Sequence, residues 1–572
     1  MIEMLVDGRT IEAKEGETIL SALRREGIHV PTLCHMEGLA PSGACRICVV
    51  ELEGSPNFLP ACSFPVAPGM KILTRSPKVL EARRTIIELL LGNHPDDCLY
   101  CARSGKCDLQ ALSQTLGIRQ RLYRSKRITR EKDVSGPSII RDPEKCILCG
   151  RCVRVCEEIQ GVGAIDFVGR GCKTFVGTAF DQGLNLSSCI NCGQCILVCP
   201  TGALTERPYL DEVIAALSDP EKFIVVQHAP AVSVSLAEEF GIEAGQDVDG
   251  KMVAALRRLG FDRVFDTSFT ADLTIMEEAS ELAERIRTGG ALPMMTSCSP
   301  GWIKYVEQFY PDFIPNLSTC KSPQQMMGAI LKSFFARREG IDLSRIISVS
   351  IMPCTAKKFE SSRPEMAPNH LPDVDYVLTT RELGQLLRMF GIDLPAMTPE
   401  AADTPFGERS SAGKLFGASG GVMEAAVRTA HYFLTGQEMP HLDIQPLRGM
   451  KGSKEVHTKI GEVEIGAAVV SGLGNARKLL DQVRAGRNDL HFIEVMTCPS
   501  GCINGGGQPI GADLNAVRAR MQALYKIDQQ EEVRVSHKNP WVLRLYDEFL
   551  GKPLGERSHE LLHTHYAPRE VL

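Results

Sequence analysis

Strand-like apolar runs alternate with helical periods after residue 210. The run FIVVQ precedes the helical pattern KMVAALRRLG, and RVFDT precedes LTIMEEASELAERIR. SVSIM, YVLTT, AAVVSG and FIEVM continue the strand series. Strands that alternate with helices are typical of an α/β domain. Because ligands of open α/β sheets bind beyond the carboxyl ends of the strands, we expect the chemistry of this domain in the loops that follow them.

The first 80 residues have a different, β-rich pattern. MIEMLVDGRTIEAKEGETIL predicts a hairpin that turns at Asp7-Gly8, a strong turn dipeptide. SALRREG predicts a short helix ending at Gly27. Residues 81–130 are predicted to be mostly helical, and their basic end, RQRLYRSKRITR, is typical of a solvated helix face.

Composition narrows the class of protein. A chain of 572 residues predicts several domains, and 44% apolar residues are ample for packed cores. A net charge of −6 and 6% aromatic residues argue against nucleic acid and anionic membranes as partners. We find no secretory signal and no apolar run of about 18 residues, so we expect a cytoplasmic protein without a membrane span.

The 21 cysteines predict metal sites rather than disulfides. Disulfide frameworks belong to small secreted domains, and this chain is neither small nor evidently secreted. Cys172 fits no cluster spacing and is predicted to be a plain structural thiol.

The first group of cysteines resembles the plant-type [2Fe-2S] ferredoxin module, with a longer first gap than usual. Gly38 and Gly43 lie in its loop, where backbone N–H groups could reach cluster sulfurs. Paired loop cysteines could instead hold zinc, but the β-rich context favours [2Fe-2S]. The predicted ligands are Cys34, Cys45, Cys48 and Cys62.

The second group places one histidine before three cysteines. A Cys3His zinc site is the alternative for this spacing. The order resembles the His/Cys3 [4Fe-4S] segment that follows the [2Fe-2S] module in [FeFe]-hydrogenases and in the large iron-sulfur subunit of respiratory complex I. The ligands would be His94, Cys98, Cys101 and Cys107.

Two copies of the bacterial ferredoxin run follow. In two-cluster ferredoxins the fourth cysteine of each run binds the other cluster. One [4Fe-4S] cluster is therefore predicted on Cys146, Cys149, Cys152 and Cys199. The other is predicted on Cys189, Cys192, Cys195 and Cys156.

Three C-terminal segments resemble the signature segments of [FeFe]-hydrogenases. They are TSCSPGW at 296–302, MPCTAKKFE at 352–360 and EVMTCPSGCINGGGQP at 494–509. The resemblance covers essentially the whole chain. It implies an α+β and α/β multidomain fold, which we divide into a β-grasp [2Fe-2S] ferredoxin (1–80), a His/Cys3 [4Fe-4S] segment (81–135), a bacterial 2[4Fe-4S] ferredoxin (136–209), a large α/β H-cluster domain (210–515) and a small-subunit-like wrapping segment (516–572).

The family carries an H-cluster, a [4Fe-4S] cubane joined through a cysteine sulfur to a two-iron unit with CO, cyanide and a dithiolate bridge. The resemblance implies that Cys354, Cys498 and Cys502 bind the cubane and that Cys502 bridges to the two-iron unit. Soft thiolates suit such cores. Glycines 505–507 would let the backbone pack tightly. Lys357 would hydrogen-bond a cyanide, and an apolar wall would keep the pocket dry, made of Ala229, Pro230, Met352, Phe416 and Met496.

Glu278, Glu281 and Arg285 share one face of a predicted helix. Taken alone, this spacing is typical of a solvated face with an ion pair. In the family, the matching positions form the proton path together with Ser318 and Cys298.

One residue departs from the family pattern. Well-known members have two adjacent cysteines in the first segment, the first for proton relay and the second for the cubane, whereas here the second is Ser299. Ser299 could bind iron as an alkoxide, Cys298 could become the ligand, or the cubane could lack one ligand and activity could be impaired.

The resemblance implies reversible interconversion of protons and hydrogen, with electrons relayed through one [2Fe-2S] and three accessory [4Fe-4S] clusters. The alternatives are a hydrogen sensor with the same cofactor and an electron-transfer subunit of a complex-I-like assembly. Expected partners are ferredoxin, NAD(P)-linked flavin and iron-sulfur subunits, and H-cluster maturation proteins. The chain has no Gly-x-Gly-x-x-Gly fingerprint after a strand, so NAD(P) chemistry would need partner subunits.

Overall fold

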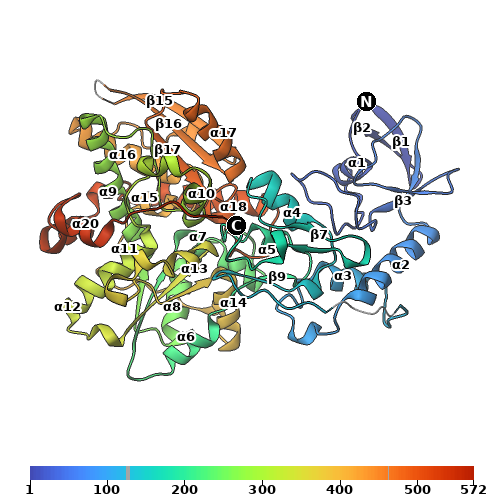
Figure 1. Ribbon diagram of the computed structural model, residues 1–572, viewed down its shortest axis with the longest axis horizontal. Coiled ribbons are helices and arrows are strands. Elements are labelled where there is room, and N and C mark those ends of the chain that lie inside the picture. The colour runs from blue at the N-terminus through green and yellow to red at the C-terminus, as the bar shows by residue number, and fades with distance from the viewer. Residues whose placement is uncertain (124–128, 461–462, 572) are drawn as a thin grey trace. The chain divides into compact units, whose positions relative to one another are not determined.

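The computed structural model describes residues 1–123, 129–460 and 463–571. The chain forms two compact units. The first comprises Met1–Glu158, Gly163–Ser187 and Val198–Thr205. The second comprises Ile159–Val162, Ser188–Leu197 and Glu206–Leu572. In Figure 1 the first unit runs from blue to teal, and most of the second runs from green to red.

The first unit begins with a five-stranded sheet of order β2-β1-β5-β3-β4. Its strands are β1 (Ile2–Val6), β2 (Arg9–Ala13), β3 (Val49–Leu52), β4 (Phe58–Pro60) and β5 (Lys71–Leu73). β1 and β2 pair antiparallel around Asp7-Gly8, which confirms the predicted hairpin. Helix α1 (Ile19–Arg25) begins at Thr18, whose hydroxyl accepts from the Ser21 amide, and buries its apolar face against the sheet.

The rest of the first unit is less helical than predicted. Helix α2 (Pro77–Asn93) and helix α3 (Asp108–Thr115) form, but no described residue between Thr115 and residue 130 is helical. α3 ends where Gly117 adopts a left-handed φ of 66°. Part of the basic stretch predicted as a solvated helix face, 124–128, lies outside the described residues. The remaining short elements are α4 (Arg151–Arg154), β6 (Ile139–Arg141), β7 (Asp166–Val168), β8 (Phe175–Gly177) and β9 (Leu204–Glu206).

Two four-stranded sheets organise the second unit, which confirms the predicted α/β domain. One has the order β11-β10-β13-β14 and is parallel throughout. The other has the order β12-β17-β16-β15, in which only β15 and β16 pair antiparallel. The strands are β10 (Phe223–His228), β11 (Arg263–Asp266), β12 (Met294–Met295), β13 (Ile346–Met352), β14 (Tyr376–Thr379), β15 (Ser453–Ile460), β16 (Val463–Ser471) and β17 (Phe492–Met496).

Helices pack around both sheets. The longest, α9 (Thr267–Thr288), begins at Asp266, whose carboxylate accepts from the Ser268 amide, and ends at Gly289 in the left-handed region. The others are α5 (Gln194–Val198), α6 (Leu210–Leu217), α7 (Pro230–Ser233), α8 (Asp249–Leu259), α10 (Pro300–Phe309), α11 (Pro323–Ile330), α12 (Ala336–Glu339), α13 (Ala356–Ser361), α14 (Thr380–Met389), α15 (Ser411–Leu415), α16 (Gly421–Thr435), α17 (Leu473–Arg484), α18 (Leu514–Gln530), α19 (Pro540–Leu545) and α20 (Glu556–Leu562). Among the described residues, no helix is both long and apolar enough to span a bilayer.

Candidate active site

The loops after four strands of the second unit line one cavity, with an empty volume of about 820 Å³. This confirms the expectation that the unusual residues gather beyond the carboxyl ends of the strands. The lining residues follow β10, β12, β13 and β17 and include Ala229, Pro230, Cys298, Ser299, Pro353, Cys354, Thr497, Cys498, Gly501 and Cys502.

Three of the predicted ligand thiols meet in this cavity. Cys354 follows β13, and Cys498 and Cys502 follow β17. Burial raises the pKa of all three, that of Cys502 to about 12, and the neighbouring thiols raise the pKa values of Cys498 and Cys502 further. Buried thiols that oppose each other's ionisation are the donor set that a soft metal core would compensate. The three thiols therefore fit an iron-sulfur cubane.

The glycine run 505–507 allows two close backbone approaches. A Cβ on Gly505 would lie 2.2 Å from the Pro353 carbonyl oxygen, and one on Gly506 would lie 2.2 Å from the Cys192 carbonyl oxygen. Only glycine fits such spacings. The run thus packs the loop after β17 onto the segment that holds Cys192, which itself lines the cavity.

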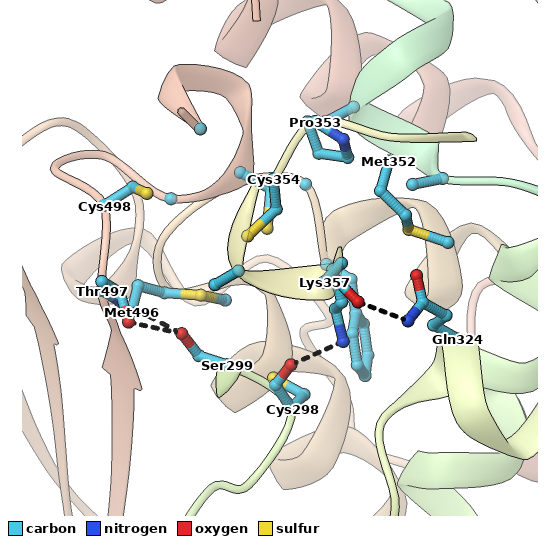
Figure 2. Close-up of a pocket in the computed structure, with 18 of the residues that line it drawn as sticks. Cys298, Ser299, Gln324, Met352, Pro353, Cys354, Lys357, Met496, Thr497 and Cys498 are labelled. Atoms are coloured by element: carbon cyan, nitrogen blue, oxygen red, sulfur yellow. Dashed lines mark hydrogen bonds between the residues drawn. The ribbon is translucent and has the colours of Figure 1, made fainter. Parts of the chain in front are cut away.

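Apolar side chains wall the cavity. Ala229, Pro230, Met352, Phe416 and Met496 all line it, and Figure 2 shows the two methionine side chains with the ligand thiols. An apolar wall limits solvent access to a metal site.

Lys357 is held by two contacts at the start of α13. Its Nζ donates to the Cys298 carbonyl oxygen at 3.1 Å and to Glu360 Oε2 at 2.9 Å. Gln324, which the sequence reasoning did not single out, also lines the cavity and donates to the Lys357 carbonyl oxygen and to Glu360. Its only sequence signal is its place in the polar run SPQQ, shortly after Ser318.

Ser299 and Cys298 have different neighbours (Figure 2). Ser299 Oγ lies 2.8 Å from Thr497 Oγ1 and accepts from the Thr497 amide at 3.3 Å, one residue before Cys498. Cys298 is half-buried, and desolvation raises the pKa of its thiol. Among charged groups, nearby Glu278 raises this pKa further and Lys357 lowers it. Ser299 therefore lies beside the loop that carries Cys498 and Cys502, whereas Cys298 lies near the Glu278 carboxylate of α9.

Helix α9 buries the two carboxylates predicted for the proton path. Glu278 is fully buried, and within the described chain neither of its oxygens has a hydrogen bond of normal geometry. Burial, and then the charge of Glu281, raise the pKa of Glu278 to about 8. Glu281 Oε2 accepts from Ser318 Oγ at 3.0 Å, and its Oε1 accepts from Arg285 at 2.6 Å. The expected ion pair forms between Glu281 and Arg285. Glu278 and Glu281 are buried, so a solvated helix face, which their spacing alone would suggest, is wrong.

The predicted [2Fe-2S] ligands converge in the first unit. Contacts with Cys45 and Cys62 lower the pKa of Cys34, and contacts with Cys34 and Cys48 raise the pKa of Cys62. The four thiols are therefore neighbours, as one cluster requires.

A small cavity in the first unit is lined by the four cysteines predicted to share one [4Fe-4S] cluster. Cys199 joins Cys146, Cys149 and Cys152 there. The exchange of fourth ligands between the two runs stays a prediction. For the other cluster, Cys156 belongs to the first unit, and Cys189, Cys192 and Cys195 belong to the second.

His94 is suited to bind a metal as neutral imidazole. Burial lowers its pKa, and its Nδ1 has no hydrogen-bond partner among the described residues. Burial also raises the pKa of Cys107, and the neighbouring thiol of Cys101 adds to this, whereas Cys98 is exposed. None of the 21 cysteines, all of which the structure describes, is in a disulfide. Cys172 is exposed, and its role as a plain structural thiol stays a prediction.

Five sequence families match the chain in order. They are a 2Fe-2S iron-sulfur cluster binding domain (1–77), the NADH-ubiquinone oxidoreductase-G iron-sulfur binding region (83–121), the ferredoxin-like domain of NADH-quinone oxidoreductase subunit 3 (136–205), the C-terminal domain of the iron only hydrogenase large subunit (222–506) and the iron hydrogenase small subunit (514–569).

Similar proteins agree with this order. The NADP-reducing hydrogenase subunit HndD of Solidesulfovibrio fructosivorans is 48% identical over 100% of both chains. Iron hydrogenase 1 of Clostridium pasteurianum is 39% identical over 99% of this chain and 100% of its own. The solved structure of a variant of apo [FeFe]-hydrogenase HydA1 from Chlamydomonas reinhardtii covers 63% of this chain and 99% of its own, with 42% identity and a TM-score of 0.58.

The fold and the site thus define an iron-sulfur oxidoreductase with N-terminal ferredoxin-like modules and an H-cluster-type domain. The 48% identity to the hydrogenase subunit HndD over the full length of both chains assigns the chain to a narrower family. It belongs to the iron-only, or [FeFe], hydrogenases.

Proposed function

We propose that this chain reversibly reduces protons to hydrogen at an H-cluster held by Cys354, Cys498 and Cys502. When bound, the H-cluster would supply the two-electron chemistry on hydrogen. The single observation that carries this proposal is the cavity in which the three thiols meet beneath an apolar wall. Infrared spectroscopy of the matured enzyme tests it: CO and cyanide bands should be present, and they should be lost in Cys502→Ala together with hydrogen turnover.

We further propose that Ser299 takes the cubane position that the family fills with cysteine, and that Cys298 relays protons. The contact of Ser299 with Thr497, next to Cys498, supports the first role. The proximity of Cys298 to Glu278 and Lys357 supports the second. The fixed ammonium of Lys357 would donate to a cyanide.

The proton path that we propose runs from Cys298 through Glu278, Ser318 and Glu281 to Arg285. Its outer half is hydrogen-bonded in the structure. Glu278 suits the inner half because a pKa of about 8 lets its carboxyl both hold and release a proton near neutral pH.

Electrons would pass through one [2Fe-2S] and three [4Fe-4S] clusters in the segments 1–80, 81–135 and 136–209. They would reach the H-cluster domain, 210–515, and the segment 516–572 would wrap around that domain. The partner would be an NAD(P)-linked subunit or ferredoxin. The similarity to an NADP-reducing hydrogenase subunit supports an NAD(P)-linked partner. Hydrogen-dependent NADP⁺ reduction by the chain with and without candidate partner subunits would test it. A cytoplasmic location stays a prediction.

A further inference from the structure

A second set of possible metal ligands lies against the proposed proton path, outside the cavity. The thiol of Cys320, a carboxylate oxygen of Glu281 and a ring nitrogen of His563 all lie within 4.8 Å of one another. All three side chains are buried. Cys320 Sγ lies 4.0 Å from Glu281 Oε2, while Arg285 holds Oε1. The second oxygen, Oε2, therefore faces the thiol while it also accepts from Ser318 Oγ and the Thr319 amide, and zinc would take the place of these two donors.

The backbone fixes His563 beside Cys320. Residues 320 and 563 form an antiparallel bridge, the Lys321 amide donates to the Leu562 carbonyl at 2.7 Å, and the Thr564 amide donates to the Thr319 carbonyl at 2.8 Å. α20, which ends at Leu562, packs on α11, which begins at Pro323. The histidine and the cysteine thus belong to two segments that tertiary structure holds in register.

The ring of His563 is oriented as in many metal sites. Its Nε2 lies 3.1 Å from Glu277 Oε2, and its Nδ1 lies 2.8 Å from Thr319 Oγ1. A carboxylate on one ring nitrogen fixes the imidazole and makes the other nitrogen a better donor. Coordination through Nδ1 would release only the hydroxyl of Thr319.

Charge and donor type favour zinc. Burial and the nearby carboxylates of Glu281, Glu278 and Glu277 raise the pKa of Cys320, so the thiol stays protonated without a cation. Thiolate, imidazole and carboxylate are the usual zinc ligands, at about 2.0–2.3 Å in tetrahedral geometry. That geometry places ligand atoms about 3.5 Å apart, so movements of about 1 Å would close the site. The partly exposed Arg285 marks a route from solvent.

We propose that Glu281, Cys320 and His563 form an inhibitory zinc site on the proton path. On binding, the S–H bond of Cys320 breaks, a Zn–S bond forms and the proton leaves to solvent, without electron transfer. Glu281 then binds zinc and no longer passes protons. Zinc binding rests on this geometry alone, whereas inhibition also rests on the proposed relay role of Glu281.

X-ray absorption at the zinc edge tests the binding. After one equivalent of Zn²⁺ is added to the matured enzyme and excess is removed, we expect one sulfur neighbour at about 2.3 Å together with nitrogen and oxygen neighbours. Cys320→Ala should lose the sulfur neighbour, and so should Cys320→Ser, which keeps the side-chain volume. Cys172→Ala, at an exposed cysteine, should keep it. A sulfur neighbour that persists in Cys320→Ala, or is missing in the wild type, would overturn the site.

Hydrogen turnover tests the inhibition. Zn²⁺ should inhibit the wild type reversibly, with recovery on addition of EDTA and unchanged iron content. Cys320→Ala should keep the basal rate and need at least about tenfold more zinc for half inhibition, because one of three ligands is gone. Equal zinc sensitivity in wild type and Cys320→Ala overturns the proposal. Zinc bound through Cys320 without inhibition overturns the inhibitory role and the relay role of Glu281, but not the site.

Discussion

Burial decides what the charged residues of α9 can do. Glu278 and Glu281 have a spacing that would suit a solvated face, yet Glu278 is fully buried and Glu281 is bound by Ser318 and Arg285. A buried carboxyl keeps its proton to higher pH because desolvation disfavours the charge. This is what makes Glu278 a candidate for proton transfer.

Glu281→Gln should keep the infrared bands of the H-cluster and lose most hydrogen turnover, by about a hundredfold or more. An amide hydrogen-bonds like a carboxyl but cannot titrate. Glu284→Gln, on the exposed side of the same helix, is the matched control and should keep full activity. Hydrogen production by Glu281→Gln at the wild-type rate would rule out this carboxylate as an essential relay.

Glu278→Gln should change how stability depends on pH. The folded protein keeps the Glu278 proton up to a pKa of about 8, whereas the unfolded chain releases it near the ordinary carboxyl pKa of 4.5. The folded state therefore binds more protons in this window, and wild-type stability falls as pH rises through it. Each pKa unit is worth about 1.4 kcal/mol. The variant cannot titrate at this position, so the difference between its melting temperature and that of the wild type should shift in the variant's favour from pH 6 to pH 8.5. If the two melting temperatures change with pH in the same way, Glu278 does not titrate as a buried carboxyl.

Ser299→Cys should make the cubane more robust, and turnover should hold or rise, because thiolate is a softer ligand than alkoxide. Cys298→Ala should keep the cubane and lose proton transfer if Cys298 is the relay. Electron paramagnetic resonance of the cubane distinguishes the roles. Loss of its signal in Cys298→Ala, with retention in Ser299→Ala, would make Cys298 the ligand instead.

At the scale of elements, the loops after parallel strands build the cavity and close backbone packing sets their shape. The run 505–507 reaches two carbonyl oxygens, those of Pro353 and Cys192, at distances that exclude any side chain. Both contacts join the loop after β17 to segments that carry predicted cluster ligands.

Gly506→Ala should therefore cost about 1–3 kcal/mol or more of stability, since its Cβ would overlap backbone rather than a movable side chain. Thermal unfolding and iron content should both fall. Gly136→Ala is the control, because its Cβ would lie 3.5 Å from the Ile139 carbonyl oxygen, an ordinary contact. Wild-type stability and iron content in Gly506→Ala would mean that the loop can move away without cost.

At the scale of the whole molecule, five ligand groups along one chain predict a heavy load of iron. One [2Fe-2S] cluster, three [4Fe-4S] clusters and an H-cluster amount to about 20 iron atoms per chain after full maturation. Metal analysis against protein concentration measures this directly. Four or five iron atoms per chain would refute the full relay, and about 14 would indicate that the accessory clusters are present without the H-cluster.

The sequence by itself determined the strand series after residue 210, the Asp7-Gly8 hairpin and the grouping of the cysteines. These depend on local periodicity, on turn dipeptides and on ligand spacing, all of which a linear chain records. The helix prediction for 81–130 went too far because charge and composition do not show where Gly117 ends α3.

Only tertiary structure decided burial and long-range contacts. It buried α9, and it placed Ser299 beside Thr497 and His563 beside Cys320. The two residues of each pair are separated by about 200 residues or more along the chain, and no local sequence pattern specifies such contacts. Desolvation, which raises the pKa of Glu278, likewise depends on the residues that pack around the carboxyl. The spacing of charged residues along a helix is the same whether that face is exposed to solvent or buried, so the sequence does not reveal the shift.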